Sequence, residues 1–461
     1  MGSYRNVSTL EGIDVVDRSA PNSRRAGVVL DAEWAEPRDS IEACRRCGTP
    51  DPKLYRHGWS SVKINDTPWS GRPLGIRLRK QRYKCQECGR TFVSTHPDVH
   101  EEYNMSCELV RYIKARGLKE AQVKNFARRL GLGEGTVWNV LDERIETINN
   151  AIPPSPERIL GIDEVHMPTG ERHTVFTDLW KGTILELLES NKKPDVAEAL
   201  REITPIAQLN PDVQVPDRFG SWENWGIVAV VMDMDTRYRD LVHEIIPRAK
   251  VIVDRFHVID KANDALTEVR KRAAAKKDEE IRERRAARGM PEPKQSYVTR
   301  WKRQKDVFKK RWDSLQSHEQ FRLEQDLKQL PELRDAYFAF DRFKQIFDHS
   351  RPAKADEALR KWERNLPESV REVFEKKLLR AVNEWREEIL NYFWFIYKYT
   401  NAGTEGLNRA IKQISAEGSG YSSFRVLKAK VMERFGERMK TRVEERTGTS
   451  IFRGNASSDR R

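Results

Sequence analysis

Two pairs of cysteines constrain the fold of this 461-residue chain more than any other feature of its sequence. The pairs are CRRC at 44–47 and CQEC at 85–88, and a glycine directly follows each one. Two such tight turns, each presenting two thiolates, complete a tetrahedral zinc site that leaves no open position for water. We therefore predict a structural Zn²⁺ site with the ligands Cys44, Cys47, Cys85 and Cys88. Reduced thiols without metal and a redox pair are the alternatives.

The positive charge of the chain is concentrated in two segments. The net charge is +13, and residues 44–96 hold twelve Lys or Arg against three Asp or Glu, while residues 261–315 hold eighteen against nine. Basic surfaces of this kind suit the phosphate backbone of a nucleic acid. By contrast, residues 1–43 hold eight acidic and five basic side chains without sustained periodicity. We expect this segment to be a disordered or loosely ordered arm.

No segment approaches the roughly 20 apolar residues that a membrane helix needs, and the N-terminus lacks a signal-peptide pattern. We therefore expect a cytoplasmic protein without a membrane partner. The fifth cysteine, Cys107, has no near partner and is expected to be a buried thiol.

Residues 44–98 read as a zinc-binding domain whose strand-like middle carries many basic side chains. As DNA-contacting candidates we select Arg77, Arg79, Lys80, Arg82 and Lys84. A solvated charged face without a ligand is the alternative interpretation.

Residues 99–150 are predicted to form a helix-turn-helix domain. Ala127 precedes Gly131 by four residues and Val137 by ten, a spacing that lets a helix at about 120–130 pack on one at about 135–147. Gly131 can adopt the positive φ that such a turn requires. The second helix would offer Thr136 and Asn139 to a DNA major groove. Any tight helical hairpin can mimic this pattern.

The rest of the chain alternates between strand-like and helical character. Proline-rich residues 151–156 read as a linker, and residues 151–260 predict the order β-β-β-α-β-α-β, typical of an α/β domain with a mixed sheet. Residues 261–400 lack strand signals and predict a long all-helical insertion. Residues 401–447 then return to the α/β domain, and residues 448–461 form a frayed tail.

Three carboxylates stand out. Asp163 and Asp233 lie near the ends of strongly apolar strands, where an ionised carboxylate is costly unless it meets a cation, and together they would suit a hard divalent ion. Glu405 shares one helix face with Asn408 and Lys412. Each carboxylate alone also fits a structural role: strand-end aspartates often cap helices, and amphipathic surface helices carry such glutamates. Glu164 should point to the strand face opposite Asp163, whereas Asp235 lies beyond its apolar run.

These motifs resemble one known family. CRRCG, RYKCQECGRTF, GIDEVH, VVMDM, VDRFHV and TNAGTEGLNRAIK, in this order, resemble the ISL3 group of bacterial insertion-sequence DDE transposases. The resemblance implies a ribonuclease H-like catalytic domain with Asp163, Asp233 and Glu405 as catalytic residues that bind Mg²⁺ or Mn²⁺. It further implies supporting roles for Asp254, His257 and Asn408.

The implied activity is Mg²⁺-dependent cleavage and transfer of DNA strands by two metal ions, with Lys412 near the phosphates. Its partners would be double-stranded DNA, namely terminal inverted repeats and target DNA, and further copies of the chain in a dimer or larger assembly. The protein would be associated with the bacterial nucleoid. A DNA-binding regulator derived from a transposase and a structure-specific nuclease are the alternatives. The inverted-repeat sequence, the target preference and the cut-and-paste or circle-forming route stay open.

Overall fold

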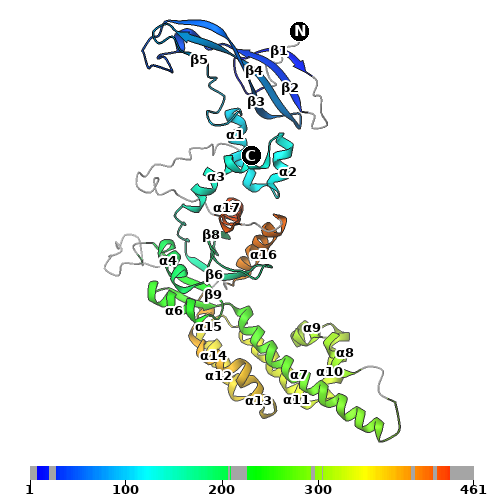
Figure 1. Cartoon of the computed structure of the whole chain (residues 1–461). Helices are drawn as coiled ribbons and strands as arrows, with labels where there is room; N and C mark the ends of the chain where they lie inside the picture. Colours follow the sequence, from blue (N-terminus) through cyan, green and yellow to red (C-terminus); the bar gives the residue numbers. More distant parts are fainter. Residues whose placement is uncertain are drawn as a thin grey trace, which may run out of the picture. The chain divides into compact units, whose positions relative to one another are not determined.

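The computed structural model describes residues 8–19, 27–205, 208, 226–291, 296–303, 305–395, 400–418 and 423–436 (Figure 1). It divides into two compact units, Met1–Ala151 with Ile411–Arg461, and Ile152–Ala410. The boundary between the two units at Ala151 and Ile152 falls in the proline-rich segment 151–156, which the sequence predicts to be a linker. The expected tail at 448–461 lies outside the described residues.

The first unit contains a sheet built on one long hairpin. Strands β3 (Leu54–Trp69) and β4 (Arg72–Cys85) pair antiparallel. Strand β2 (Val28–Trp34) runs parallel to β4, β1 (Asp14–Ser19) pairs with β2, and the short β5 (Thr91–Val93) pairs with β4. The order is therefore β1-β2-β4-β3, with β5 beside β4. A short 3₁₀ helix, η1 (Arg38–Ser40), follows β2.

The expectation of a loose arm at 1–43 is wrong for the described part of that segment, because it supplies β1 and β2. Val28, Leu30 and Ala32 of β2 are buried, in strict alternation with more exposed neighbours. This period of two is the pattern of a strand with one buried face, and its acidic residues occupy the other face. The high charge of the segment concealed the alternation.

Helices complete the first unit. They are α1 (Cys107–Arg116), the 3₁₀ turn η2 (Gly117–Lys119), α2 (Val123–Leu130), α3 (Glu134–Asn149) and α17 (Phe424–Phe435). Helix α17 packs on α3 and η2. Its Lys430 is fully buried and donates to the backbone oxygens of Glu120 and Ala121, at 2.5 and 3.4 Å. Residues 401–447 were assigned from sequence to the α/β domain, but the part from Ile411 onward groups with this first unit.

The second unit is built on a five-stranded mixed sheet. Its strands are β6 (Ile159–His166), β7 (Arg172–Asp178), β8 (Thr183–Leu188), β9 (Ala229–Met232) and β10 (Lys250–Val253). Their order is β10-β9-β6-β7-β8. Strand β9 runs parallel to both β10 and β6, whereas β7 runs antiparallel to both β6 and β8. With α4 (Lys193–Ile203) and α6 (Thr236–Ile245), the chain follows the predicted order β-β-β-α-β-α-β.

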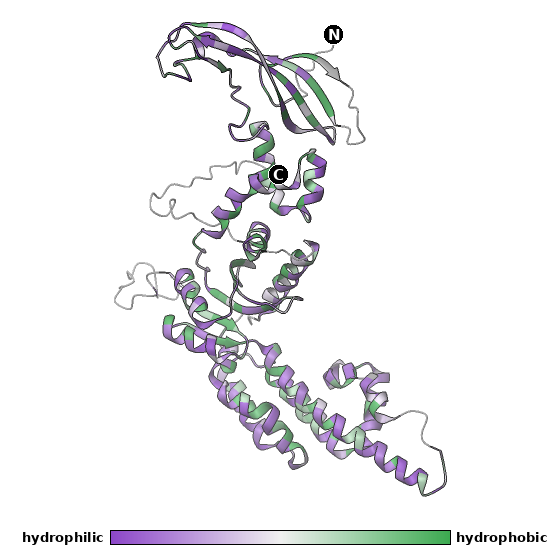
Figure 2. Cartoon of the chain, viewed as in Figure 1, coloured by the Kyte–Doolittle hydropathy of each residue, from purple (hydrophilic) through white to green (hydrophobic). Residues whose placement is uncertain are grey.

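The two faces of this sheet bury different helices. Leu160 and Ile162 of β6 share a core with α4 and α6, while Ile159 shares a core with α7 (Arg255–Ala286). Strands β6 and β9 are among the green, hydrophobic segments of Figure 2, as expected for strands covered on both faces. Alternate residues of β6 therefore serve two separate hydrophobic layers.

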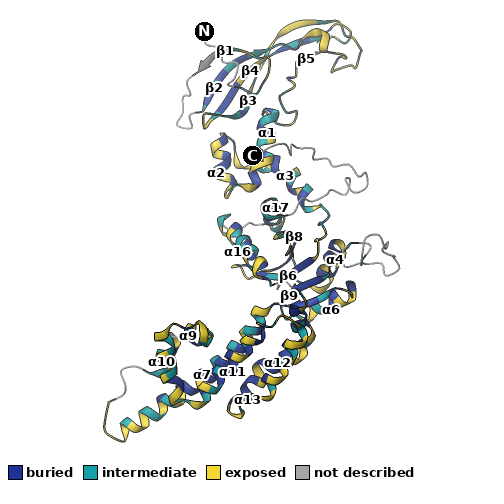
Figure 3. Ribbon diagram, turned by 180° about the vertical axis from the view of Figure 1, so that it is seen from behind, coloured by how far each residue is buried: buried dark blue, intermediate teal, exposed yellow. Residues whose placement is uncertain are grey.

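Helices fill the described chain from residue 255 to 394. After α7 come α8 (Tyr297–Arg303), α9 (Lys305–Lys309), η5 (Trp312–Ser314), α10 (Ser317–Gln329), α11 (Pro331–Ile346), α12 (Pro352–Arg364), α13 (Glu368–Phe374), the π-helical turn η6 (Glu375–Leu379), α14 (Arg380–Glu384), α15 (Arg386–Asn391) and η7 (Tyr392–Trp394). Figure 3 shows buried faces where α7 and α11 pack together and exposed faces on their outer sides. Helix α16 (Ala402–Glu417) follows. No helix of the described residues combines the length and apolarity needed to cross a membrane.

Candidate functional site

The four cysteines of the two CxxC pairs come together in the first unit. Their sulfur atoms all lie within 4.8 Å of one another, and Cys44 Sγ and Cys88 Sγ are 3.9 Å apart. Zinc–sulfur bonds of about 2.3 Å in a tetrahedron place sulfurs about 3.8 Å apart, so the cluster has the dimensions of a zinc site. The hydroxyl of Thr49 hydrogen-bonds Cys47 and lowers the pKa of this thiol to about 6, which favours the thiolate that a metal requires.

The two cysteine turns have matching backbone geometry. Gly48 and Gly89 have φ of 74° and 67°, and each donates its N–H to the carbonyl oxygen of the first cysteine of its pair. Only glycine adopts this left-handed conformation without cost, which explains why a glycine follows both pairs. Cys107, expected to be buried, is instead half-buried at the start of α1.

The five basic residues selected on β4 do not form one surface. Successive side chains of a strand alternate between its faces, so Arg77 and Arg79 face opposite to Lys80, Arg82 and Lys84. Lys80 is half-buried, and this burial lowers its pKa.

Two of these basic residues are engaged by strand β2. Arg77 pairs with Asp31 at 2.7 Å and Arg79 with Glu33 at 2.5 Å. Both arginines keep more than half of their side-chain surface exposed, and the Arg79 guanidinium also lies 5.5 Å from the ring centre of Trp59. A DNA phosphate at this face would have to compete with two carboxylates.

In the segment predicted to be a helix-turn-helix, α2 and α3 are joined by a tight turn at Gly131. Gly131 ends α2 with φ of 70°, and the buried Ala127 allows the close packing of the two helices. A Cβ at Gly131 would lie 2.7 Å from the Cβ of Pro73, so glycine is also required sterically. On α3, Asn139 is exposed and Thr136 half-buried.

The two strand aspartates lie side by side in the second unit. Strands β6 and β9 are parallel and pair Ile162 with Met232, so Asp163 and Asp233 are the next residues on adjacent strands. Neighbouring strands are separated by about 4.8 Å. Burial, together with the negative charges of Asp233 and Glu405, raises the pKa of Asp163 to about 7. The contribution of Glu405 to this shift is smaller than those of burial and of Asp233, so the meeting of all three carboxylates stays a prediction.

Hydrogen bonds hold these carboxylates in place. Asn408, one turn after Glu405 on α16, donates to Asp163 Oδ2 at 2.9 Å. His257 Nε2 lies 2.8 Å from Asp233 Oδ1, and this contact raises the pKa of the imidazole. Asp254 caps the N-terminus of α7, where its side chain accepts from the Phe256 N–H. Lys412 lies on the part of α16 that groups with the first unit, so its phosphate contact stays a prediction.

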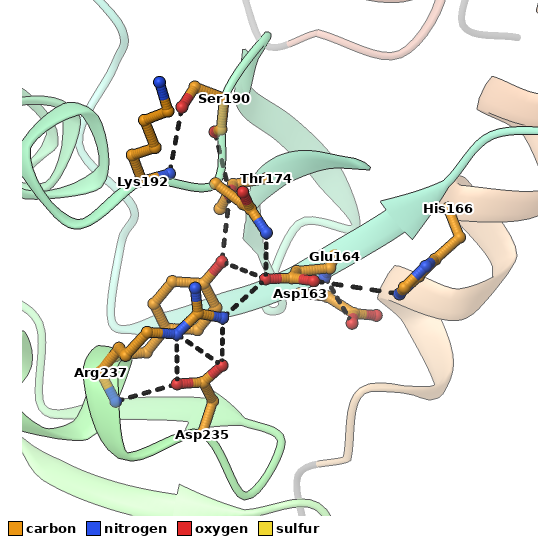
Figure 4. A network of polar contacts seen from close by, with 10 residues as sticks. Asp163, Glu164, His166, Thr174, Ser190, Lys192, Asp235 and Arg237 are labelled. Atoms are coloured by element: carbon orange, nitrogen blue, oxygen red, sulfur yellow. Dashed lines mark hydrogen bonds and ion pairs between the residues drawn. The ribbon is translucent and has the colours of Figure 1, made fainter. Parts of the chain in front are cut away.

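Glu164 lies on the opposite face of β6, as expected from strand alternation. Its Oε1 accepts hydrogen bonds from Tyr238 at 2.8 Å, from Asn191 at 3.1 Å and from Arg237 at 3.1 Å (Figure 4). Asp235 caps α6 and is also bound to Arg237. Glu164 therefore fixes α6 to the sheet, while Asp235 is occupied in capping this helix.

Sequence reasoning missed four residues that seat α16. Asn401 is buried, and its backbone N–H donates to Asp254 Oδ2 at 3.1 Å. The hydroxyls of Thr404 and Thr177 are 2.9 Å apart and buried. Gly161 faces them, since a Cβ there would lie 2.4 Å from Thr177 Oγ1. A glycine two residues before Asp163 was the available signal, because it permits the close approach of a helix to the strand.

The donor chemistry of the site fits a hard divalent cation. Asp163 and Asp233 offer carboxylates on adjacent strands, and the side-chain oxygens Asn401 Oδ1 and Asn408 Oδ1 are buried without a hydrogen-bond partner among the described residues. Oxygen ligands of this kind are preferred by Mg²⁺ and Mn²⁺.

Many basic residues of the second charged segment already have partners. Arg270 is buried and donates to the Trp301 carbonyl oxygen at 2.6 Å. Arg300 pairs with Asp326, and Lys310 pairs with Glu319. The charge excess counted from the sequence therefore overstates the number of cations available for DNA.

Comparisons with known proteins agree with these observations. A transposase family model for the ISL3 group matches residues 160–431, and a zinc-finger model of the transposases of IS204, IS1001, IS1096 and IS1165 matches residues 42–88. The transposase for insertion sequence element IS1001 from Bordetella parapertussis is 23% identical over 400 residues, which cover 84% of this chain and 87% of that protein. Since the transposase model spans more than half of the sequence, the chain belongs to the ISL3 group of insertion-sequence transposases.

Proposed function

We propose that this transposase cleaves and joins DNA strands at a metal site formed by Asp163, Asp233 and Glu405. The observation that carries the proposal is the register of β6 and β9, which brings the two aspartates together on adjacent strands. The raised pKa of Asp163, caused by burial and by the other two carboxylates, supports a site built for a cation. The strand order β10-β9-β6-β7-β8 with an antiparallel β7 supports a ribonuclease H-like fold for this unit.

The side chains around the carboxylates have separate tasks in this proposal. The Asn408 amide restrains the Asp163 carboxylate, and His257 restrains Asp233. Asp254 joins the start of α7 to Asn401, just before the helix that carries Glu405. Bound Mg²⁺ would lower the pKa of a coordinated water or hydroxyl and would neutralise charge at the phosphorus. The same three carboxylates would serve cleavage and joining without a covalent protein intermediate.

We further propose that the first unit recognises the transposon ends. Thr136 and Asn139 at the start of α3 would approach base edges in the major groove. Arg82 and Lys84 would contact phosphates, because they lie on the β4 face opposite to the ion pairs of Arg77 and Arg79 with β2. The four-cysteine zinc ribbon would keep the β4 end rigid enough for such contacts.

One experiment tests the catalytic proposal. Labelled transposon ends and a target plasmid are incubated with the protein and Mg²⁺, and joined products, cleaved ends and retarded complexes are separated on gels. Joined products support transposition. Cleavage without joining would instead indicate a nuclease, and retardation alone would indicate a regulator.

The catalytic assignment is tested with the variant Asp233→Asn. It should abolish cleavage while end binding remains nearly unchanged, because the amide preserves the shape of the side chain and removes its charge. Full cleavage by this variant would show that Asp233 is not a catalytic ligand. Asp235→Asn is the matched control, since Asp235 caps α6.

A further inference from the structure

A groove lies between α11 and α12 in the helical part of the second unit. Its cavity volume is about 590 Å³, within the range of sites that hold small ligands. It is lined along α11 by residues one to two turns apart, among them Arg334, Phe338 and Arg342, and along α12 by Lys361 and Trp362.

The floor of the groove is apolar. Ile346 and Trp362 are each 6% exposed, and Phe338 is a half-buried ring packed against the main core of the unit. The indole N–H of Trp362 donates to the Ala339 carbonyl oxygen at 2.7 Å, so it is not available to a ligand. The floor therefore offers apolar and aromatic contact.

The rim of the groove is basic. Arg334, Arg342 and Lys361 are exposed. Arg342 has no ion-pair partner among the described residues. The acidic residue of the lining, Asp335, already accepts a hydrogen bond from Ser369 at 2.8 Å and lies 3.4 Å from Arg334. The two arginines are eight residues apart on α11, a rise of about 12 Å along the helix.

This combination fits a ligand with a negative group and a flat apolar group. We propose that the groove binds unstacked nucleotides of single-stranded DNA, with phosphates on the arginine rim and a base against Phe338. Duplex DNA fits less well, because its bases are stacked and cannot reach an apolar floor. The inference rests on the proposed function, in which strand cleavage frees DNA ends whose terminal base pairs can open.

The test uses the full-length protein and a fluorescently labelled strand of thymidine nucleotides, with binding followed by anisotropy at several salt concentrations. Replacing both arginines, Arg334→Ala with Arg342→Ala, should weaken binding and reduce the salt slope by roughly 1.4, at about 0.7 for each lost phosphate contact. Arg360→Ala is the matched control, because Arg360 lies on α12 outside the groove lining and pairs with Asp356. It should change neither quantity.

The base contact is tested with Phe338→Leu, which keeps an apolar side chain in the core but removes the ring. Affinity for the strand, measured well below the melting temperature of the variant, should fall roughly five- to ten-fold with an unchanged salt slope. Phe338→Tyr, which keeps the aromatic face, should retain binding.

Several results would overturn the inference. One such result is that the groove variants bind the single strand as tightly as the Arg360→Ala control does. Another is that the groove variants lose as much affinity for duplex DNA as for the single strand. Competition by thymidine monophosphate at micromolar concentration would assign the groove to free nucleotides instead. Competition by an acidic peptide alone would assign it to a protein partner. Because end cleavage is measured separately, failure here with intact cleavage leaves the proposed function standing.

Discussion

Replacing Gly161 with alanine tests whether the seating of α16 sets the position of the third carboxylate. The added Cβ would lie 2.4 Å from Thr177 Oγ1, 3.0 Å from Thr404 Oγ1 and 3.1 Å from Leu179 Cδ2. All three atoms belong to buried or packed side chains, so the methyl group must displace Thr177 or lift α16. The variant attacks the contact between strand and helix without altering any carboxylate.

The magnitude follows from two effects. Overpacking a close-packed site costs about 1–3 kcal/mol, and loss of the buried hydroxyl–hydroxyl bond adds about 1 kcal/mol. The total of roughly 2–4 kcal/mol corresponds to a fall in melting temperature of roughly 5–15 °C for a unit of this size. A displacement of Glu405 by about 1 Å would lower the cleavage rate roughly 100-fold.

The assay combines thermal unfolding with Mg²⁺-dependent end cleavage, measured well below the melting temperature of the variant. Gly406→Ala is the control, because it adds a methyl group on α16 where no other atom lies within 4 Å. Thr183→Val is a second control, since it removes a buried hydroxyl without a described partner from the same sheet. If Gly161→Ala melted and cleaved like the wild type, the close approach would be refuted. Destabilisation with full activity would refute only the link to Glu405.

Three further predictions concern the first unit. Cys85→Ser should reduce the zinc content from about one ion per chain to near zero, measured by atomic absorption; retention of the metal would refute the four-cysteine site. Asp31→Asn combined with Glu33→Gln should release the two arginines opposite and increase the salt slope of DNA binding by up to about 1.8; an unchanged slope would show that this face does not contact DNA. Burial lowers the pKa of Lys430 from 10.5 to about 8, so the folded state releases this proton at a lower pH than the unfolded state does. The free energy of unfolding should therefore rise between these pH values relative to Lys430→Met, measured by urea unfolding, and a falling difference would contradict the burial argument.

The sequence predicts local features with a strong physical cause. The positive φ at Gly48, Gly89 and Gly131 follows from turns that only glycine adopts easily. The order of strands and helices from residue 159 to 253 follows from the length and continuity of the apolar runs.

Features that depend on distant partners could not be predicted in this way. The pairing of β2 with β4 joins residues more than forty positions apart, and the acidic side chains of β2 gave its segment the composition of a loose arm. The positions of Arg77 and Arg79 opposite to Lys80 follow from alternation, but their ion pairs depend on β2. Likewise, the contact of Thr404 with Thr177 spans 227 residues and leaves no local pattern in the sequence.

The buried Lys430 has a consequence for how the protein is made. Because α17 packs on α3, the first unit contains a helix that is translated only after the whole of the second unit. A ribosome must therefore synthesise the whole second unit before the first unit can complete its core. Nascent or prematurely terminated chains would carry an unfinished N-terminal unit, in which the backbone oxygens of Glu120 and Ala121 lack their lysine. The core of the first unit would then be completed only in chains that extend through α17.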